Sequence, residues 1–147
     1  MRNLFHKVSR RVVTYCIEYD IGTIAIGYSA GWKQCLALGR RNNQNFAQVP
    51  HATLLAMITY KAQLVGITVI KVNEAYTSKC SFADGESIEK YAHYCGRRVG
   101  RGLFRTGTGK KINADVNAAL NILKKGVPEA FRYGIEGLVT VPCSMSF

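Results

Sequence analysis

The stretch "KINADVNAALNI", residues 111–122, decides how this chain is interpreted. It holds one carboxylate, Asp115, among three asparagines and several small residues, and it follows the most basic part of the chain. Apolar residues recur at helical spacing and predict a helix over residues 112–125. Its buried side should carry Val116, Leu120 and Leu123. A negative charge near a helix N-terminus is stabilised by about 0.3–1 kcal/mol, so Asp115 has a structural explanation beside any functional one.

The charge balance points to a polyanionic partner. The 147 residues include 20 Lys and Arg against 9 Asp and Glu, which gives a net charge of +11. A surplus of this kind favours nucleic acid, although a basic domain with no single target would show the same composition.

The cysteines do not predict a disulfide framework. There are five of them, an odd number, and no CxxC pair occurs: Cys16, Cys35, Cys80, Cys95 and Cys143. This usage fits a reducing cytoplasm. The sequence has no apolar run near the ~20 residues of a membrane helix, and its basic start lacks the apolar stretch of a signal peptide, so we expect no membrane partner.

The order of predicted elements indicates an α/β fold. An amphipathic helix opens the chain, with these residues on one face: Leu4, Val8, Val12 and Tyr15. A strand at 22–29, a helix from Pro50 to Gly66, a strand at 67–76 and an irregular stretch at 76–110 precede the last helix. Such alternation predicts mostly parallel strands covered by helices. Two or three strands leave open edges, so we expect part of a larger fold.

The irregular stretch carries a cluster of positive charge. No acid lies between Lys90 and Asp115, whereas this segment holds the basic residues Arg97, Arg98, Arg101, Arg105, Lys110 and Lys111. The aromatic residues Tyr91, Tyr94 and Phe104 are interleaved with them. Because basic side chains neutralise phosphates and aromatic rings stack on unpaired bases, the segment predicts a nucleic-acid surface. The alternative is a solvated basic loop.

Two acids could share a metal ion. Glu74 lies at the carboxyl end of a predicted strand, where open α/β sheets bind their ligands, and Asp115 begins the next helix. If the topology brings them together, Mg²⁺ would relieve their repulsion through oxygen ligands, as in two-metal nucleases. The alternative is that both are solvated surface acids.

Three segments carry a resemblance to a known family: "GRRNNQNFAQVPH" (39–51), "EAYTSKCSFADGESIEKY" (74–91) and "RRVGRGLFRTGTGKKINADVNAALNI" (97–122). Together with "HKVS" (6–9) and "GIEGL" (134–138), they resemble the C-terminal part of the TnpB (OrfB) proteins of bacterial insertion sequences, which are relatives of the type V CRISPR effectors. The resemblance implies an RNase H-like RuvC core that cuts DNA with Mg²⁺ under the guidance of an RNA. It also implies that Asp115 is the last RuvC acid.

The chain departs from the family pattern at its other acids. The family's first catalytic Asp lies on a strand before the "HKVS" helix, and Asp20 in "YDIGT" imitates that motif on the wrong side of the helix. Gly27 stands where many members carry a Glu, so Glu74 would serve as a relocated second acid. With two of three acids, we expect a truncated protein that cleaves weakly or not at all alone.

The zinc ribbon of the family is eroded here. Cys80 remains, Ala83 or Asp84 replaces its partner, and "RTGTGK" (105–110) replaces the second pair. Cys80, His93 and Cys95 would supply three ligands, whereas a structural zinc site requires four. The sequence therefore does not predict zinc.

These observations combine into one prediction and its alternatives. We expect the C-terminal half of an RNase H-like fold, divided into a core part (1–75), a degenerate zinc-ribbon insertion (76–111) and a final helix with tail (112–147). The expected function is that of a transposase-associated, prokaryotic DNA endonuclease fragment. Its partners would be DNA, a guide RNA and an N-terminal half on a separate chain. A non-catalytic DNA- or RNA-binding module is the alternative, and no motif favours a ribonucleoprotein structural role.

Overall fold

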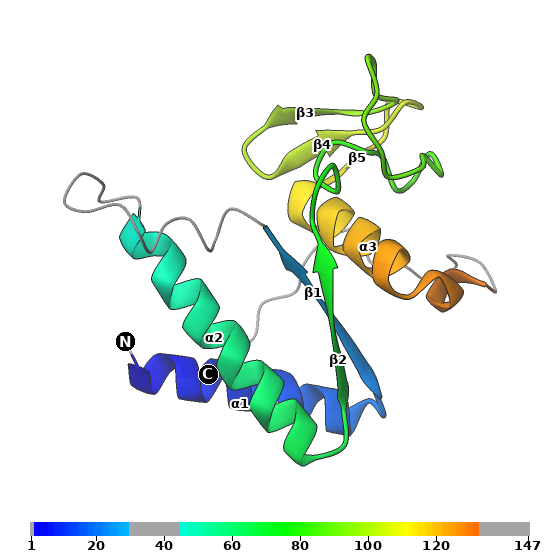
Figure 1. The fold of residues 1–147 in the computed structure, drawn as a ribbon. Helices are drawn as coiled ribbons and strands as arrows, with labels where there is room; N and C mark the ends of the chain where they lie inside the picture. The colour runs from blue at the N-terminus through cyan, green and yellow to red at the C-terminus, as the bar shows by residue number, and fades with distance from the viewer. Residues whose placement is uncertain (1, 30–44, 133–147) are drawn as a thin grey trace. The chain divides into compact units, whose positions relative to one another are not determined.

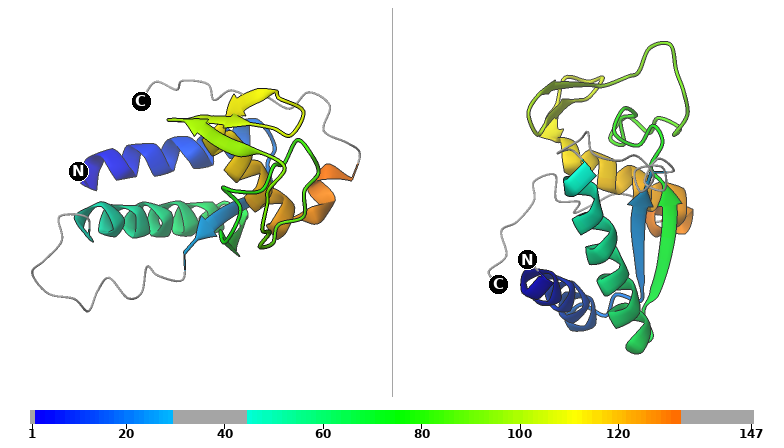
Figure 2. Two further views of the ribbon diagram at one scale, coloured as in Figure 1. Left: turned by 90° about the horizontal axis from the view of Figure 1, so that it is seen from above. Right: turned by 60° about the vertical axis from the view of Figure 1, so that its left-hand side comes forward.

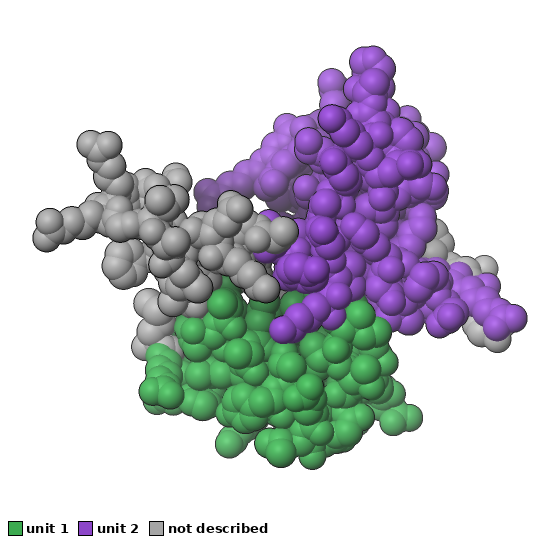
Figure 3. All heavy atoms as spheres, viewed as in Figure 1, with its two compact units in different colours: residues 1–26, 30–70, 146–147 green, residues 27–29, 71–145 purple. Residues whose placement is uncertain are grey.

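The structure, a computed structural model, describes residues 2–29 and 45–132. Residues 30–44 and 133–147, which include the "GIEGL" segment, lie outside the described part. The chain divides into two compact units, one built mainly from residues up to 26 and 30–70, the other from 27–29 and 71–145 (Figure 3). Within the described residues, every helix is too short or too polar to cross a bilayer.

The first unit is built on two helices, α1 (Arg2–Glu18) and α2 (Asn45–Leu64), which pack against each other. Their shared core contains Val13, Cys16, Ala62 and Ile67. A lysine joins the two helices as well. Lys61 Nζ on α2 donates to the His6 carbonyl at 2.8 Å and to Ser9 Oγ at 2.7 Å on α1.

The buried face of α1 differs from the predicted one. Its buried residues are Ser9, Val13 and Cys16, whereas Leu4 is 51% exposed. The reason is Ser9, whose hydroxyl donates to the Phe5 carbonyl at 2.6 Å and receives the Lys61 ammonium. An apolar pattern does not register a serine that is buried by hydrogen bonding. Helix α2 also begins at Asn45, ahead of the predicted start at Pro50.

Strands β1 (Thr23–Tyr28) and β2 (Thr68–Asn73) form a two-stranded sheet (Figure 1). The Thr68 amide donates to the Gly22 carbonyl at their starts, and the Glu74 amide donates to the Tyr28 carbonyl at their ends. The two strands therefore run parallel, joined by the α2 crossover, as the α/β pattern predicts.

The stretch expected to be irregular contains an antiparallel sheet, which we call the ribbon: β3 (Arg97–Gly100), β4 (Leu103–Arg105) and β5 (Lys111–Asn113). The prediction missed it because strands of three or four residues are too short to show alternation. Its turns contain Gly102 and Gly109, whose φ angles of 69° and 88° suit glycine. Phe104 and Ile112 are cross-strand partners and bury one face of the ribbon.

Helix α3 (Ala114–Gly126) follows β5 directly, and a short 3-10 helix, η2 (Pro128–Phe131), follows it. Asn113 caps the helix, since its Oδ1 accepts from the amides of Asp115 and Val116 at 2.9 and 3.0 Å. This cap satisfies the orphan donors of the first turn and makes the helix begin two residues later than predicted.

The buried face of α3 is polar, contrary to the prediction. Asn117 and Asn121 are fully buried, whereas the three predicted apolar residues are only half-buried: Val116, Leu120 and Leu123. Asn117 accepts from the Phe82 amide at 2.9 Å and donates to the Cys80 carbonyl at 2.9 Å. Asn121 donates to the Thr77 and Cys80 carbonyls, both at 2.8 Å. The two side chains thus fix the loop before the ribbon onto the helix. Figure 2 shows the backbone of this loop beside α3.

Replacing Asn117 by Ala should destabilise the protein by about 1–3 kcal/mol, because it leaves the buried Phe82 amide without a partner. The Cys80 carbonyl keeps its bond from Asn121 and adds little to this cost. Chemical denaturation measures the change. Asn3→Ala, at an exposed position on α1, is the control and should stay within about 0.5 kcal/mol of the parent protein. Equal stability of Asn117→Ala and Asn3→Ala would contradict the role of the buried asparagine.

Candidate nucleic-acid interface and metal centre

Three positive side chains stand in register across the ribbon. Arg97 pairs with Arg105 between β3 and β4, and Arg105 pairs with Lys111 between β4 and β5. Directly opposed residues project from the same face of a sheet, about 4.5–5.5 Å apart at their Cβ atoms, and like charges in such pairs are destabilising. We call these three residues the cationic row.

No carboxylate of the described residues 2–29 and 45–132 forms an ion pair with the cationic row. The ion pair of that part of the chain joins Arg11 and Glu18 at 3.7 Å, on α1. The repulsion within the row is therefore not offset by an ion pair among these residues, and the row can accept an external anion.

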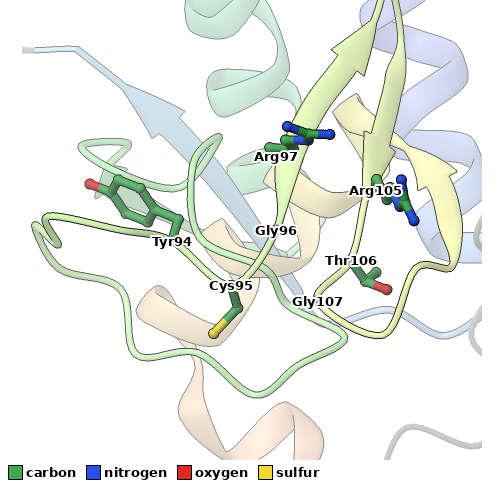
Figure 4. A pocket seen from close by; sticks show the side chains of 7 residues that line it. All are labelled: Tyr94, Cys95, Gly96, Arg97, Arg105, Thr106 and Gly107. Atoms are coloured by element: carbon green, nitrogen blue, oxygen red, sulfur yellow. The ribbon is translucent and has the colours of Figure 1, made fainter.

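A shallow depression of about 330 Å³ opens beside the row (Figure 4). Its lining comes from the end of the loop and from two ribbon strands: Tyr94, Cys95, Gly96, Arg97, Arg105, Thr106 and Gly107. A Cβ atom at Gly96 would lie 2.5 Å from the Phe104 ring and 2.7 Å from the Arg105 carbonyl oxygen. Glycine is therefore needed for the chain to pass close over Phe104 before Arg97.

The other predicted contacts are distributed around the ribbon. Arg98 aligns with Phe104 in the register, so it projects from the face opposite Arg97. Its Nε donates to the Gly100 carbonyl at 3.3 Å. Arg101 lies in the turn between β3 and β4 and Lys110 in the turn before β5, and both are exposed.

Phe104 does not fit its predicted role. Its ring is 1% exposed and packs in the ribbon core with Ile112, so it is not available to stack on a base. The aromatic residue at the surface is Tyr94, which lines the first depression and a second one of about 210 Å³. Its ring meets that of Tyr91 edge-on, with centroids 5.6 Å apart.

Glu74 lies beside Gly27, the position where the family resemblance implies a Glu in many members. A Cβ atom built on Gly27 would lie 3.4 Å from the Glu74 Cβ and 2.6 Å from Ile122 Cδ1 on α3. The Glu74 side chain therefore starts next to the place where a side chain at position 27 would start. Ile122 fills the space that such a side chain would need.

Asp115 is exposed in the first turn of α3, and its amide is bound by the Asn113 cap. Ile122, which lies near Glu74, follows it by seven residues, about 10 Å along the helix axis. Glu74 therefore lies near Ile122, which is about two turns of α3 away from Asp115. Among the described residues, no three His, Cys, Asp or Glu side chains gather as a metal site.

Lys125 is a contact that sequence reasoning missed. Its Nζ donates to the Asn73 carbonyl at 2.8 Å, which fixes the end of β2 to the last turn of α3. A lysine in the last turn of a helix is ordinary, so no sequence signal marked this role.

The pKa values of two described thiols of the second unit, those of Cys80 and Cys95, are raised, which favours the protonated form. Burial raises the pKa of the Cys80 thiol, and the nearby Glu86 and Glu89 carboxylates raise it further. Partial burial of its sulfur, together with the Glu86 carboxylate, also raises the pKa of Cys95. Because the thiolate is the nucleophile, neither cysteine is poised for chemistry near neutral pH.

Cys95 should therefore be alkylated more slowly than a free peptide thiol at pH 8, although the residue is exposed. Its raised pKa stabilises the fold below the ordinary value of 9.0, and that contribution is lost as the pH rises above it. Peptide mapping by mass spectrometry after iodoacetamide treatment at pH 8 and 10 measures the rates. Alkylation of Cys95 as fast as that of an unstructured cysteine peptide at pH 8 would contradict this protection.

Comparison with known proteins identifies relatives of this chain. A family model described as "Cas12f1-like, TNB domain" matches residues 51–122. The CRISPR-associated endodeoxyribonuclease Cas12f1 of Sulfoacidibacillus thermotolerans is 34% identical over 119 residues, which cover 80% of this chain and 25% of that protein. The TnpB-like protein ORF457 of Acidianus two-tailed virus is 29% identical over 128 residues, or 85% of this chain and 25% of that protein. The chain thus spans about a quarter of the length of these curated relatives. It belongs to the TnpB family.

Proposed function

We propose that this chain binds nucleic acid through the cationic row and carries two of the acids of an RNA-guided, RuvC-type DNA endonuclease associated with transposition. The observation that supports this best is the row itself: Arg97, Arg105 and Lys111 in direct register with no acid paired to them in the described residues.

The row suits the backbone of a nucleic acid. Its three charges line up across neighbouring strands, so successive phosphates can lie along them and replace the repulsion with attraction. Tyr94 lies at the edge of the same depression, where its ring could stack on an unpaired base. Arg101 and Lys110, in the two turns, extend the positive surface beyond the row.

The two acids suit a divalent cation in donor type. Glu74 is half-exposed and Asp115 exposed, and Mg²⁺ commonly takes one or two carboxylates together with water and substrate phosphates. Bound there, Mg²⁺ would supply an activated water and stabilise the leaving oxygen of a phosphodiester. The protein's own contribution is to hold Glu74 at the end of β2 through the bond from the Glu74 amide to the Tyr28 carbonyl.

In this proposal, α1, β1, α2, β2 and α3 belong to an RNase H-like core, and residues 76–111 form an insertion whose parent is a zinc ribbon. The core corresponds to segments 1–75 and 112–147. Two carboxylates are fewer than a two-metal site requires, so this chain by itself should bind nucleic acid and cleave it weakly or not at all.

A second candidate function is a non-catalytic DNA- or RNA-binding module. The observation that favours it is the packing of Ile122 against Gly27, which fills the position where the family acid would stand. In that case Glu74 would be a solvated strand-end residue, and all function would lie on the ribbon.

The binding part of the proposal predicts a trade-off in Arg105→Gln. This change should weaken binding of a fluorescent single-stranded DNA or RNA and lower the slope of log K against log salt by about 1, because one phosphate contact is lost. It should also stabilise the free protein by about 0.2–1 kcal/mol, because Arg105 is flanked by two like charges. Anisotropy titrations and thermal unfolding measure the two effects.

Arg98→Gln, on the opposite face, is the matched control and should change affinity less than Arg105→Gln. Absence of salt-dependent binding in the parent protein would contradict the proposal as a whole. Nicking of supercoiled DNA with Mg²⁺ distinguishes an active nuclease from a chain that only binds nucleic acid. Strong nicking that Asp115→Ala abolishes would show that the chain holds a complete catalytic site, against the expectation stated above.

A further inference from the structure

The family resemblance implies a zinc ribbon in residues 76–111, but the side chains of that segment do not fit the ion. Among the described residues no three His, Cys, Asp or Glu side chains come together. Cys80 is fully buried and its Sγ lies 3.6 Å from the Glu89 carbonyl oxygen, whereas Cys95 is exposed. The ribbon nevertheless has a defined fold, so another interaction must join its loops.

One such interaction is centred on Glu86, a carboxylate that is only 9% exposed. Its Oε2 accepts from the Ser81 amide at 2.7 Å, and its Oε1 accepts from the Cys95 amide at 3.0 Å. Both acceptor atoms are thus used, one for each of two loops that are distant in the sequence. Hydrogen bonds to an ionised carboxylate are roughly twice as strong as neutral ones.

Asp84 makes the third connection. Its Oδ2 accepts from the Gly107 amide at 2.7 Å. Gly107 belongs to the turn of residues 106–110, in which the Thr106 amide donates to the Lys110 carbonyl and Thr106 Oγ1 accepts from the Lys110 amide. A Cβ atom at Gly107 would lie 3.1 Å from the Cys95 carbonyl oxygen, so this turn and the Cys95 loop are in close contact.

These bonds connect the loop after Cys80 with the turn that replaces the second cysteine pair, and they also hold the segment at Cys95. We propose that Asp84 and Glu86, together the carboxylate clasp, cross-link this ribbon in place of a metal and act as positioning residues for the cationic row. The second part of this proposal rests on the proposed nucleic-acid function.

The carboxylate clasp bonds the backbone close to two members of the cationic row, Arg97 and Arg105. Glu86 holds Cys95, two residues before Arg97, and Asp84 holds Gly107, two residues after Arg105. Arg97 and Arg105 are partners across β3 and β4. Each member of this pair therefore has an acid-anchored amide two residues away, and its guanidinium group remains available to an anion.

The proposed cross-link predicts that the stability of the protein does not depend on a metal ion. The melting temperature of the purified chain should be the same with EDTA as with added Zn²⁺. Glu86→Gln and Asp84→Ala should each lower it by at least about 3 °C, because each removes an acceptor for a backbone amide. Asp84→Asn keeps one acceptor oxygen and should recover most of the loss. A fall in the melting temperature of the parent protein with EDTA, or no fall in either variant, would overturn the proposal.

A binding test separates positioning from simple electrostatics. Neutralising an acid near a polyanion-binding face should by charge alone tighten binding. The clasp predicts the opposite: Glu86→Gln should weaken binding of single-stranded DNA by about fivefold or more, measured well below the melting temperature of the variant. Glu89→Gln removes an exposed acid of the same segment, whose carboxylate accepts from the Tyr91 hydroxyl, and this variant should bind as tightly as the parent or more so. Tighter binding by Glu86→Gln would refute the positioning role.

Amide hydrogen exchange keeps the two proposals distinguishable. If the parent protein fails to bind nucleic acid, the proposed function is wrong. The clasp is then tested by the amides of Ser81, Cys95 and Gly107, which should be protected in the parent protein. Glu86→Gln should lose protection at Ser81 or Cys95, and Asp84→Ala at Gly107. Unchanged exchange at all three amides in these variants would overturn the cross-link.

Discussion

Two buried asparagines on one face of α3 hold the second unit together. Asn117 and Asn121 direct their amides to the backbone of the loop that precedes the ribbon, and both converge on the Cys80 carbonyl. Such groups are costly to bury unless they are paired, so the loop has one favourable position on the helix. Since β5 leads directly into the Asn113 cap of α3, the same helix also carries the ribbon. The asparagines of the "NADVNAALN" stretch are therefore largely structural, and they surround an acid that is free at the surface.

The ribbon separates its two faces by chemistry. Phe104 and Ile112 bury one side, and Arg97, Arg105 and Lys111 share the other. A sheet this small gains little stability from its apolar core, so the repulsion within a row of like charges has to be offset by another interaction. The proposed binding of a nucleic acid would supply one. Asp84 and Glu86 accept backbone amides, and within the described residues neither forms an ion pair with the row.

Much of the fold was readable from the sequence because the long elements have strong patterns. The three α-helices, the two parallel strands and the basic character of residues 97–111 were all indicated by periodicity or composition. The sequence did not show which faces of α1 and α3 are buried. Ser9, Asn117 and Asn121 are buried through hydrogen bonds, which a hydrophobic pattern does not record. The ribbon strands were too short to show a period. Phe104 was misassigned for a related reason: an aromatic residue between arginines looks exposed until the register places it opposite Ile112. The proximity of Glu74 to position 27 follows from the pairing of β1 with β2, in which the Glu74 amide donates to the Tyr28 carbonyl. The sequence does not give the register of that pair.

The packing of Ile122 over Gly27 limits which side chains position 27 can hold. A Cβ atom there would lie 2.6 Å from the terminal methyl of Ile122, so even an alanine requires that methyl to move away. A longer side chain, such as the Glu that the family resemblance implies for this position, would also need the space beyond the methyl. Substitutions at positions 27 and 122 should therefore be energetically coupled.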